Sequence, residues 1–234
     1  MVKVILQMLT FNRLRYTRES LQSLLSNPYP FHLIIHDNGS TEKGMIDYLR
    51  SMKEKEKRIV DLILSSENLG LTIPMNSFWK SYKEVYPYLG KIDNDTVVPE
   101  DAVERIVDIM DHCPDVGICH GFHWFDESYS RKRLINVNGR ILLRAKWGGG
   151  CFYLLRSSIV HRYGYISTSY GKMGGWTEYQ MKVRRRGHKI VYAYPLVKVK
   201  HLGNILSGRK EESADYLDYY ARIKKIRRVK NGNS

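Results

Sequence analysis

The chain has 234 residues, of which 43% are hydrophobic, and this is enough for one sizeable core in an ordinary globular protein. Lysine and arginine number 38 against 24 acidic residues, so the formal net charge is +14. That charge suggests an anionic partner, such as nucleic acid, a phosphorylated small molecule or a membrane surface, although a merely soluble basic surface would also account for it.

Targeting and cysteine patterns point to an intracellular protein. The apolar run at the N-terminus is too short for a signal peptide, and no stretch approaches the length of a membrane span. Cys113, Cys119 and Cys151 show neither CxxC nor CxxH spacing, which argues against a zinc site or a disulfide framework and fits a reducing compartment. We therefore expect a cytoplasmic location, with any membrane contact made peripherally at the inner surface.

Apolar strands alternate with helices through the first half of the chain. Strands are predicted at 2–9, 31–41, 59–66 and 88–95, and helices within 10–27, 43–58, 67–85 and 99–113, with Thr17 capping the first helix and Pro99 beginning the last. Such alternation predicts a parallel sheet covered by helices on both faces. Ligands of open α/β sheets bind at the carboxyl ends of the strands, and the polar clusters at 10–13, 37–41, 67–70 and 93–95 fall there.

The second half is less regular. We expect a strand at 117–126, a strand or hairpin around Asn138-Gly139, a glycine-led segment at 147–164 with an apolar strand and a short helix, a helix at 177–187, and at least one strand within 188–203. Residues 216–230 have the pattern of a basic amphipathic helix. That helix either packs on its own domain or binds an anionic membrane or nucleic acid.

The segment Asp93-Asn94-Asp95 ends an apolar strand with two carboxylates one residue apart. Like charges so placed cost stability unless something positive lies between them. One interpretation is a divalent cation such as Mg²⁺ or Mn²⁺, which prefers oxygen ligands and, for Mn²⁺, also accepts imidazole. The other is that the acids simply cap the following helix.

The order of these motifs resembles that of GT-A-fold glycosyltransferases, most closely family 2. The resemblance spans residues 2 to about 203. The segments that carry it are "TFNR", "DNGSTE" (with Glu42 in place of the family's last aspartate), "NLGLTIPMN", "DND", "GGGCFYLLR", an acid before "RRRG", and a closing histidine. It implies a Rossmann-like, mostly parallel sheet flanked by helices, with the basic helical tail following it.

The resemblance also assigns roles to individual residues. Glu178 is implied to be the general base, and Asp95 and His201 to hold Mn²⁺ or Mg²⁺, with Asp93 binding either the metal or the nucleotide's ribose. Donor-binding positions are Thr10, Asn12, Arg13, Asp37, Asn68, Asn76, Asp93 and Asn94, and sugar- or acceptor-side positions are Trp147, Gly148, Gly149 and Trp176. Arg13 has a second interpretation as a solvated residue at a helix start.

We therefore expect an inverting glycosyltransferase of the hexosyltransferase type, with a UDP-sugar the commonest donor by resemblance. Residues 1–205 would form one catalytic domain, of which 1–98 bind the nucleotide-sugar and 99–205 the acceptor, followed by the basic tail at 206–234. The acceptor would be a hydroxyl on a glycan, a lipid-linked glycan or a nucleic acid. The alternative is a non-catalytic, basic nucleic-acid-binding protein on a nucleotide-binding α/β fold.

Overall fold

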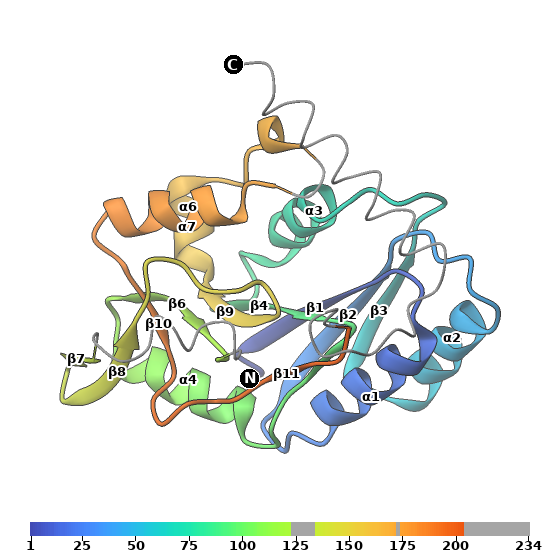
Figure 1. Ribbon diagram of the computed structural model, residues 1–234, viewed down its shortest axis with the longest axis horizontal. Helices are drawn as coiled ribbons and strands as arrows, with labels where there is room; N and C mark the ends of the chain where they lie inside the picture. The colour runs from blue at the N-terminus through green and yellow to red at the C-terminus, as the bar shows by residue number, and fades with distance from the viewer. Residues whose placement is uncertain (123–133, 172–173, 204–234) are drawn as a thin grey trace.

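A computed structural model describes residues 1–122, 134–171 and 174–203 (Figure 1). The first half contains β1 (Val4–Thr10), α1 (Leu14–Leu25), β2 (Phe31–Asp37), α2 (Met45–Lys55), β3 (Ile59–Leu64), α3 (Thr72–Tyr82), β4 (Tyr88–Asp93), β5 (Thr96–Val97) and α4 (Ala102–His112). The second half contains β6 (Val116–His120), β7 (Leu134–Val137), β8 (Arg140–Arg144), β9 (Phe152–Arg156), α6 (Ser157–Tyr163), a 3₁₀ turn at Thr168–Tyr170, α7 (Trp176–Arg185), β10 (Lys189–Tyr192) and β11 (Lys200–His201).

The main sheet has the strand order β3-β2-β1-β4-β9-β6-β10-β8-β7. Strands β3, β2, β1 and β4 are all parallel, and their register sets Thr10 opposite Asp37 and Leu9 opposite Asp93. The polar clusters predicted at the carboxyl ends of the strands therefore meet at one edge of the sheet. The prediction of a mostly parallel α/β fold is confirmed.

Strand β9 departs from the parallel pattern, since it pairs antiparallel with both β4 and β6. Because of this reversal, the segment that enters β9 begins at the same edge as the segment that leaves β4. The amide of Asp93 donates to the carbonyl of Cys151 at 2.9 Å across that junction. The glycine-led segment 148–150 is thus held beside the end of β4.

Helices cover both faces of the sheet, as Figure 1 shows. One core cluster packs apolar residues of α1, α2 and α4 against the sheet, and a second packs residues of α3, α6 and α7 against the opposite face. Fully buried strand residues such as Leu6, Ile35 and Leu154 explain why these strands read as continuous apolar runs rather than alternating ones.

Several predicted boundaries were wrong in detail. Helix α1 begins at Leu14, so Thr17 lies inside it, where the hydroxyl donates to the Arg13 carbonyl at 3.1 Å instead of capping the helix. Helix α4 begins at Ala102, three residues after Pro99, and β6 ends at His120. The hairpin at Asn138-Gly139 is confirmed, and both residues have the positive φ that a tight turn between twisted strands requires. The predicted tail at 206–234 and the end of the predicted strand at 117–126 lie outside the described residues.

Candidate functional site

In the Asp93-Asn94-Asp95 segment, Asp93 is the last residue of β4 and Asp95 lies in the turn between β4 and β5, both at the carboxyl edge of the sheet. Asp93 is paired with the ammonium group of Lys91, which stands two residues earlier on the same strand. Lys91 also donates to the carbonyl of Gly150 at 3.0 Å. Burial raises the pKa of the Asp93 carboxyl above its ordinary value, and the positive charge of Lys91 opposes that rise.

Asp95 forms a buried ion pair with Arg13, and each of the two side chains is 5% exposed. The backbone of Gly203 closes over this pair, since a Cβ atom there would lie 2.7 Å from Asp95 Oδ2 and from Arg13 Nη2. Removing either partner of such a buried ion pair would leave the other charge uncompensated in a buried place. Arg13 is therefore an internal counter-charge, which excludes the interpretation of Arg13 as a solvated residue.

His201 reaches the same turn from the far end of the chain. Strand β11 pairs antiparallel with β5, which sets His201 opposite Thr96. Its Nε2 atom lies 3.3 Å from Asp95 Oδ1. The structure thus brings together the three residues that the sequence analysis singled out for a metal, namely Asp93, Asp95 and His201.

A hydrogen-bonded cluster around Asp37 forms the second part of the site. The carboxylate of Asp37 accepts from the Thr10 hydroxyl at 2.8 Å and from the amide of Ser40 at 2.8 Å. Gly39, at φ +81°, lies so close to the next loop that a Cβ atom would be 2.7 Å from the backbone of Glu67. The loops that follow β2 and β3 are therefore in direct backbone contact.

Asn12 and Arg13 both have positive φ, at 52° and 66°, which is uncommon for residues other than glycine. The Asn12 side-chain oxygen accepts from the amides of Thr41 and Glu42 at 2.8 and 3.0 Å, and Asn12 is fully buried. Such strain persists only where the surroundings determine it, and it concentrates at functional sites.

Three further predicted donor residues hold backbone segments in place. Asn94 donates to the Asn12 carbonyl at 3.1 Å, and Asn68 accepts from the amide of Gly70 at 2.9 Å. Asn76 forms a two-way bridge to the backbone of Ile166, at 2.8 and 3.0 Å. Each of these three side chains is therefore hydrogen-bonded to backbone.

Glu178 lies in the first turn of α7 and is half-buried. Trp176 begins the same helix and stacks on Tyr153 with the ring centroids 4.3 Å apart. A small cavity lies beside this stack, lined by Trp176 together with Thr72, Lys91 and Gly150. Trp147 is 40% exposed at the start of the glycine segment.

Gln180 ties the glycine segment to α7. Its amide accepts from the Gly148 amide at 2.8 Å and donates to the Gly148 carbonyl at 3.0 Å. It also bonds to Nε2 of the fully buried His120 at 2.9 Å, and a Cβ atom on Gly148 would lie 2.4 Å from that imidazole ring. The helix that carries Glu178 is thereby fixed to the segment beside Asp93.

Sequence reasoning missed Lys91, Cys151 and Gln180. The signal for Lys91 was a lysine inside the apolar strand "YLGKID", and the signal for Gln180 was a polar residue on the apolar face of α7. Cys151 was set aside because the spacing test sees only ligands that are close in the sequence. The other possible metal ligands near it, Asp93 and His201, lie far away in the sequence.

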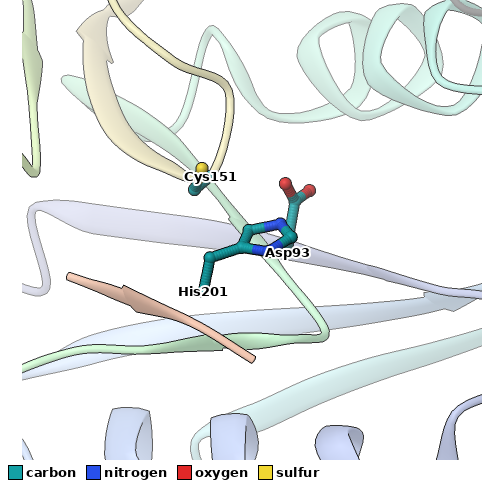
Figure 2. Close-up of side chains that lie close together, drawn as sticks. All are labelled: Asp93, Cys151 and His201. Atoms are coloured by element: carbon teal, nitrogen blue, oxygen red, sulfur yellow. The ribbon is translucent and has the colours of Figure 1, made fainter. Parts of the chain in front are cut away.

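The residues present fit a divalent cation. Ligand atoms of Asp93, Cys151 and His201 all lie within 4.8 Å of one another (Figure 2). A carboxylate and an imidazole suit Mn²⁺, while Mg²⁺ would favour the carboxylates. This group does not include Asp95, whose carboxylate is engaged by Arg13.

Comparison with known proteins decides the family. A model described as "Glycosyl transferase family 2" matches residues 6–169. The chain belongs to glycosyltransferase family 2. That membership favours an enzyme over the non-catalytic nucleic-acid-binding alternative. No curated protein sequence matches the chain.

Solved structures with this fold include other glycosyltransferases. The mannosyltransferase PcManGT from Pyrobaculum calidifontis, solved with GDP-Man and Mn²⁺, has a TM-score of 0.66 at 16% identity over 81% of this chain. TarS residues 1–349 from S. aureus, solved with UDP-GlcNAc, has a TM-score of 0.65 at 13% identity over 93% of this chain. GalNAc-T7, solved with UDP, GalNAc and Mn²⁺, has a TM-score of 0.68 at 10% identity over 86% of this chain.

At these low sequence identities, the likenesses show the GT-A fold alone. The chain spans 56% of the length of PcManGT, 64% of TarS 1–349 and 44% of GalNAc-T7. Within the described part of the chain, no helix is long and apolar enough to cross a membrane.

Proposed function

We propose that this chain is a metal-dependent, inverting glycosyltransferase that moves a hexose from a nucleotide-sugar to an acceptor hydroxyl. The observation that carries the proposal is the meeting of three separate segments at one edge of the sheet. The Asp37 cluster, the Asp93–Asp95 turn and His201 lie there together, and Gln180 ties α7 to the same place.

The nucleoside binds at the Thr10, Asn12 and Asp37 side of this edge, with Asp93 on the ribose or the metal. Asn68, Asn76 and Asn94 act through the backbone segments that they hold. A UDP-sugar is the first candidate donor, because TarS 1–349 was solved with UDP-GlcNAc and GalNAc-T7 with UDP. A GDP-sugar is the rival donor, because PcManGT was solved with GDP-Man.

Asp95, His201 and Asp93 would hold Mn²⁺ or Mg²⁺. When bound, the cation neutralises the diphosphate leaving group and orients it. Arg13 keeps the Asp95 carboxylate in position, and Lys91 does the same for Asp93. Trp147, Trp176 and Gly149 are assigned to the sugar or acceptor side. Gly148, whose amide and carbonyl both bond to Gln180, positions that segment from behind.

Glu178 acts as the general base. Its carboxylate takes the proton from the acceptor hydroxyl as that oxygen attacks the anomeric carbon and the nucleoside diphosphate leaves from the opposite face. Assistance of this kind contributes about 10²- to 10⁴-fold in rate.

Donor binding tests the proposal directly. UDP or a UDP-sugar is expected to raise the melting temperature in the presence of Mn²⁺ or Mg²⁺, because a ligand that binds only the folded state stabilises it by about 2.7 kcal/mol at 100 times its Kd. Excess chelator and Asp95→Ala should each remove the effect. Asp115→Ala is the matched control, since Asp115 pairs with Lys189 at the opposite, amino end of β6. Equal stabilisation in chelator, with no effect of Asp95→Ala on that stabilisation, contradicts the metal assignment. A donor panel that measures nucleotide release then identifies the sugar and the base.

The acceptor is anionic in this proposal, because a net charge of +14 exceeds what a nucleotide-sugar site needs. The test compares the full chain with a chain ending at Gly208, using anionic vesicles and duplex DNA at low and high salt. Binding to DNA should fall steeply with salt through counterion release, whereas a membrane-bound helix also retains apolar contacts. Truncation that lowers thermal stability and leaves both kinds of binding unchanged would establish a tail packed on its own domain.

A further inference from the structure

Three potential ligand side chains of different chemistry converge beside the Asp93–Asp95 turn. Asp93 comes from the end of β4, Cys151 from the segment that enters β9, and His201 from β11, as Figure 2 shows. Cys151 adds a sulfur ligand, and a cation that binds only through oxygen would not coordinate it.

The backbone fixes the positions of these three residues. The Asp93 amide donates to the Cys151 carbonyl at 2.9 Å. The amide of Leu202, the residue after His201, donates to the Asp95 carbonyl at 2.7 Å. Each candidate ligand is therefore attached to, or lies next to, a backbone hydrogen bond across the site. Sites built on paired backbone hold their geometry better than sites built on free loops.

The distances suit one shared ion after small side-chain rotations. Zinc binds sulfur at about 2.3 Å and imidazole nitrogen or carboxylate oxygen at about 2.0–2.2 Å, so two ligands of a tetrahedral ion lie about 3.5 Å apart. The ligand atoms here all lie within 4.8 Å of one another. Rotation about side-chain bonds on binding would bring the ligand atoms to that spacing.

We propose that Asp93, Cys151 and His201 form a three-ligand site for a thiophilic divalent cation, in first place Zn²⁺, with a fourth position left open. A mixed sulfur, nitrogen and oxygen ligand set suits Zn²⁺ or Co²⁺, and it does not suit Mg²⁺. The Cys151 thiol loses its proton to solvent on binding, so two anionic ligands and a neutral imidazole balance the charge of the ion.

Lys91 supports this site from outside the ligand set. Its ammonium group pairs with one carboxylate oxygen of Asp93 and bonds to the Gly150 carbonyl at 3.0 Å, next to Cys151. A group that bonds to a ligand in this way orients it toward the metal.

The inference has a consequence for transfer that rests on the proposed function. Zn²⁺ in this site occupies Asp93 and His201, which the proposed function assigns to the donor's cation. Micromolar Zn²⁺ should therefore inhibit an enzyme supplied with Mn²⁺, and Cys151→Ser should relieve that inhibition. The binding experiments below use no donor, so their outcome does not depend on the transferase activity.

Cobalt reports sulfur ligation in the full-length protein. Titration with Co²⁺ should give a thiolate-to-cobalt charge-transfer band in the near ultraviolet that Zn²⁺ abolishes by displacing the cobalt. Cys151→Ser should lose the band, and Asp93→Asn and His201→Gln should each weaken binding by about 100-fold or more, since even residues outside the ligand set cost 10- to 100-fold. His161→Gln is the matched control, because His161 also lies beside a carboxylate, with its Nδ1 3.4 Å from Glu84, but on the exposed surface.

Thiol alkylation supplies a second, independent measurement. Cys113 and Cys119 are fully buried, whereas Cys151 is half-buried, so brief alkylation of the native protein should modify Cys151 first. Zn²⁺ is expected to slow that modification at least tenfold, and Mg²⁺ is expected not to. An unchanged alkylation rate in saturating Zn²⁺, or a cobalt band that survives in Cys151→Ser, overturns the proposal.

Discussion

The ammonium group of Lys91 and the carboxylate of Asp93 form an ion pair within β4, two residues apart on the same face of the strand. Arg13 is the corresponding partner of Asp95. Each acid of the Asp93-Asn94-Asp95 segment therefore has its own protein cation. The fold can hold two neighbouring carboxylates at a buried strand end before any metal binds.

Lys91→Met should destabilise the protein by about 1–3 kcal/mol, because it leaves Asp93 with reduced charge compensation in a largely buried position. The double variant Lys91→Met with Asp93→Asn should recover part of that loss, because neither charge then remains. Urea denaturation at neutral pH measures all four corners of this double-mutant cycle. Additive losses across the cycle would show that the pair contributes nothing to stability.

Gly39→Ala tests the contact between the loops that follow β2 and β3. The substitution should lower stability by about 1–3 kcal/mol and weaken nucleotide binding, because Gly39 combines φ +81° with a Glu67 backbone atom 2.7 Å from the added Cβ. Gly139→Ala is a matched control, since Gly139 has the same φ of +81° with nothing within 4 Å. Thermal denaturation of both variants separates the contact from the backbone strain. Equal losses in the two would mean that the loop contact costs nothing to disturb.

The fold could be predicted from the sequence because its main signals are local. Apolar runs bounded by polar turns predicted the strands and helices of the first half, and the rule for open α/β sheets predicted which edge carries the polar residues. The reversal of β9 had no local signal, since strand direction depends on pairing with β4 and β6, which lie far away in the sequence. Helix α1 begins at Leu14, earlier than the predicted cap at Thr17, because Asn12 and Arg13 adopt positive φ and the helix starts directly after them.

The site could be predicted only in part, for a related reason. The motifs named the acids and His201, but not the partners that hold them. The spacing of the cysteines along the chain gave no reason to link Cys151 with Asp93 and His201, although all three lie close together in space. The roles of Glu178, Asp95 and the donor residues stay predictions, because the positions of side chains do not by themselves show the chemistry they perform.

His120 gives the protein a pH-dependent stability. Burial lowers the pKa of this imidazole from 6.5 to about 4. The unfolded chain therefore binds a proton more readily than the folded one between these values, so the stabilising contribution is fully present above pH 6.5 and is lost as the pH falls toward 4. The effect is worth about 3 kcal/mol across that window.

Urea denaturation at pH 7 and pH 4.5 should show a smaller loss for His120→Asn than for the original chain, since asparagine does not titrate. His112→Asn is the control, because the His112 side chain is 59% exposed. The comparison uses the difference between the two pH values and not the absolute stability, which the substitution lowers in any case. A slope in His120→Asn as steep as in the original chain would place the titrating group elsewhere.

Glu178→Gln addresses the chemistry of transfer itself. Glutamine keeps the shape and hydrogen bonding of the side chain but cannot accept a proton at neutral pH, so transfer should fall by about 10² or more. Donor affinity should stay within a few-fold, because Glu178 lies on α7 and not among the loops assigned to the nucleotide. Glu104→Gln is the matched control, since Glu104 occupies the first turn of α4 and experiences the same helix dipole far from the site. Nucleotide release and acceptor glycosylation, measured together, distinguish lost transfer from lost donor binding. Transfer that survives within a few-fold would move the base to another acid, with Asp126 and Glu127, which lie outside the described residues, as the next candidates.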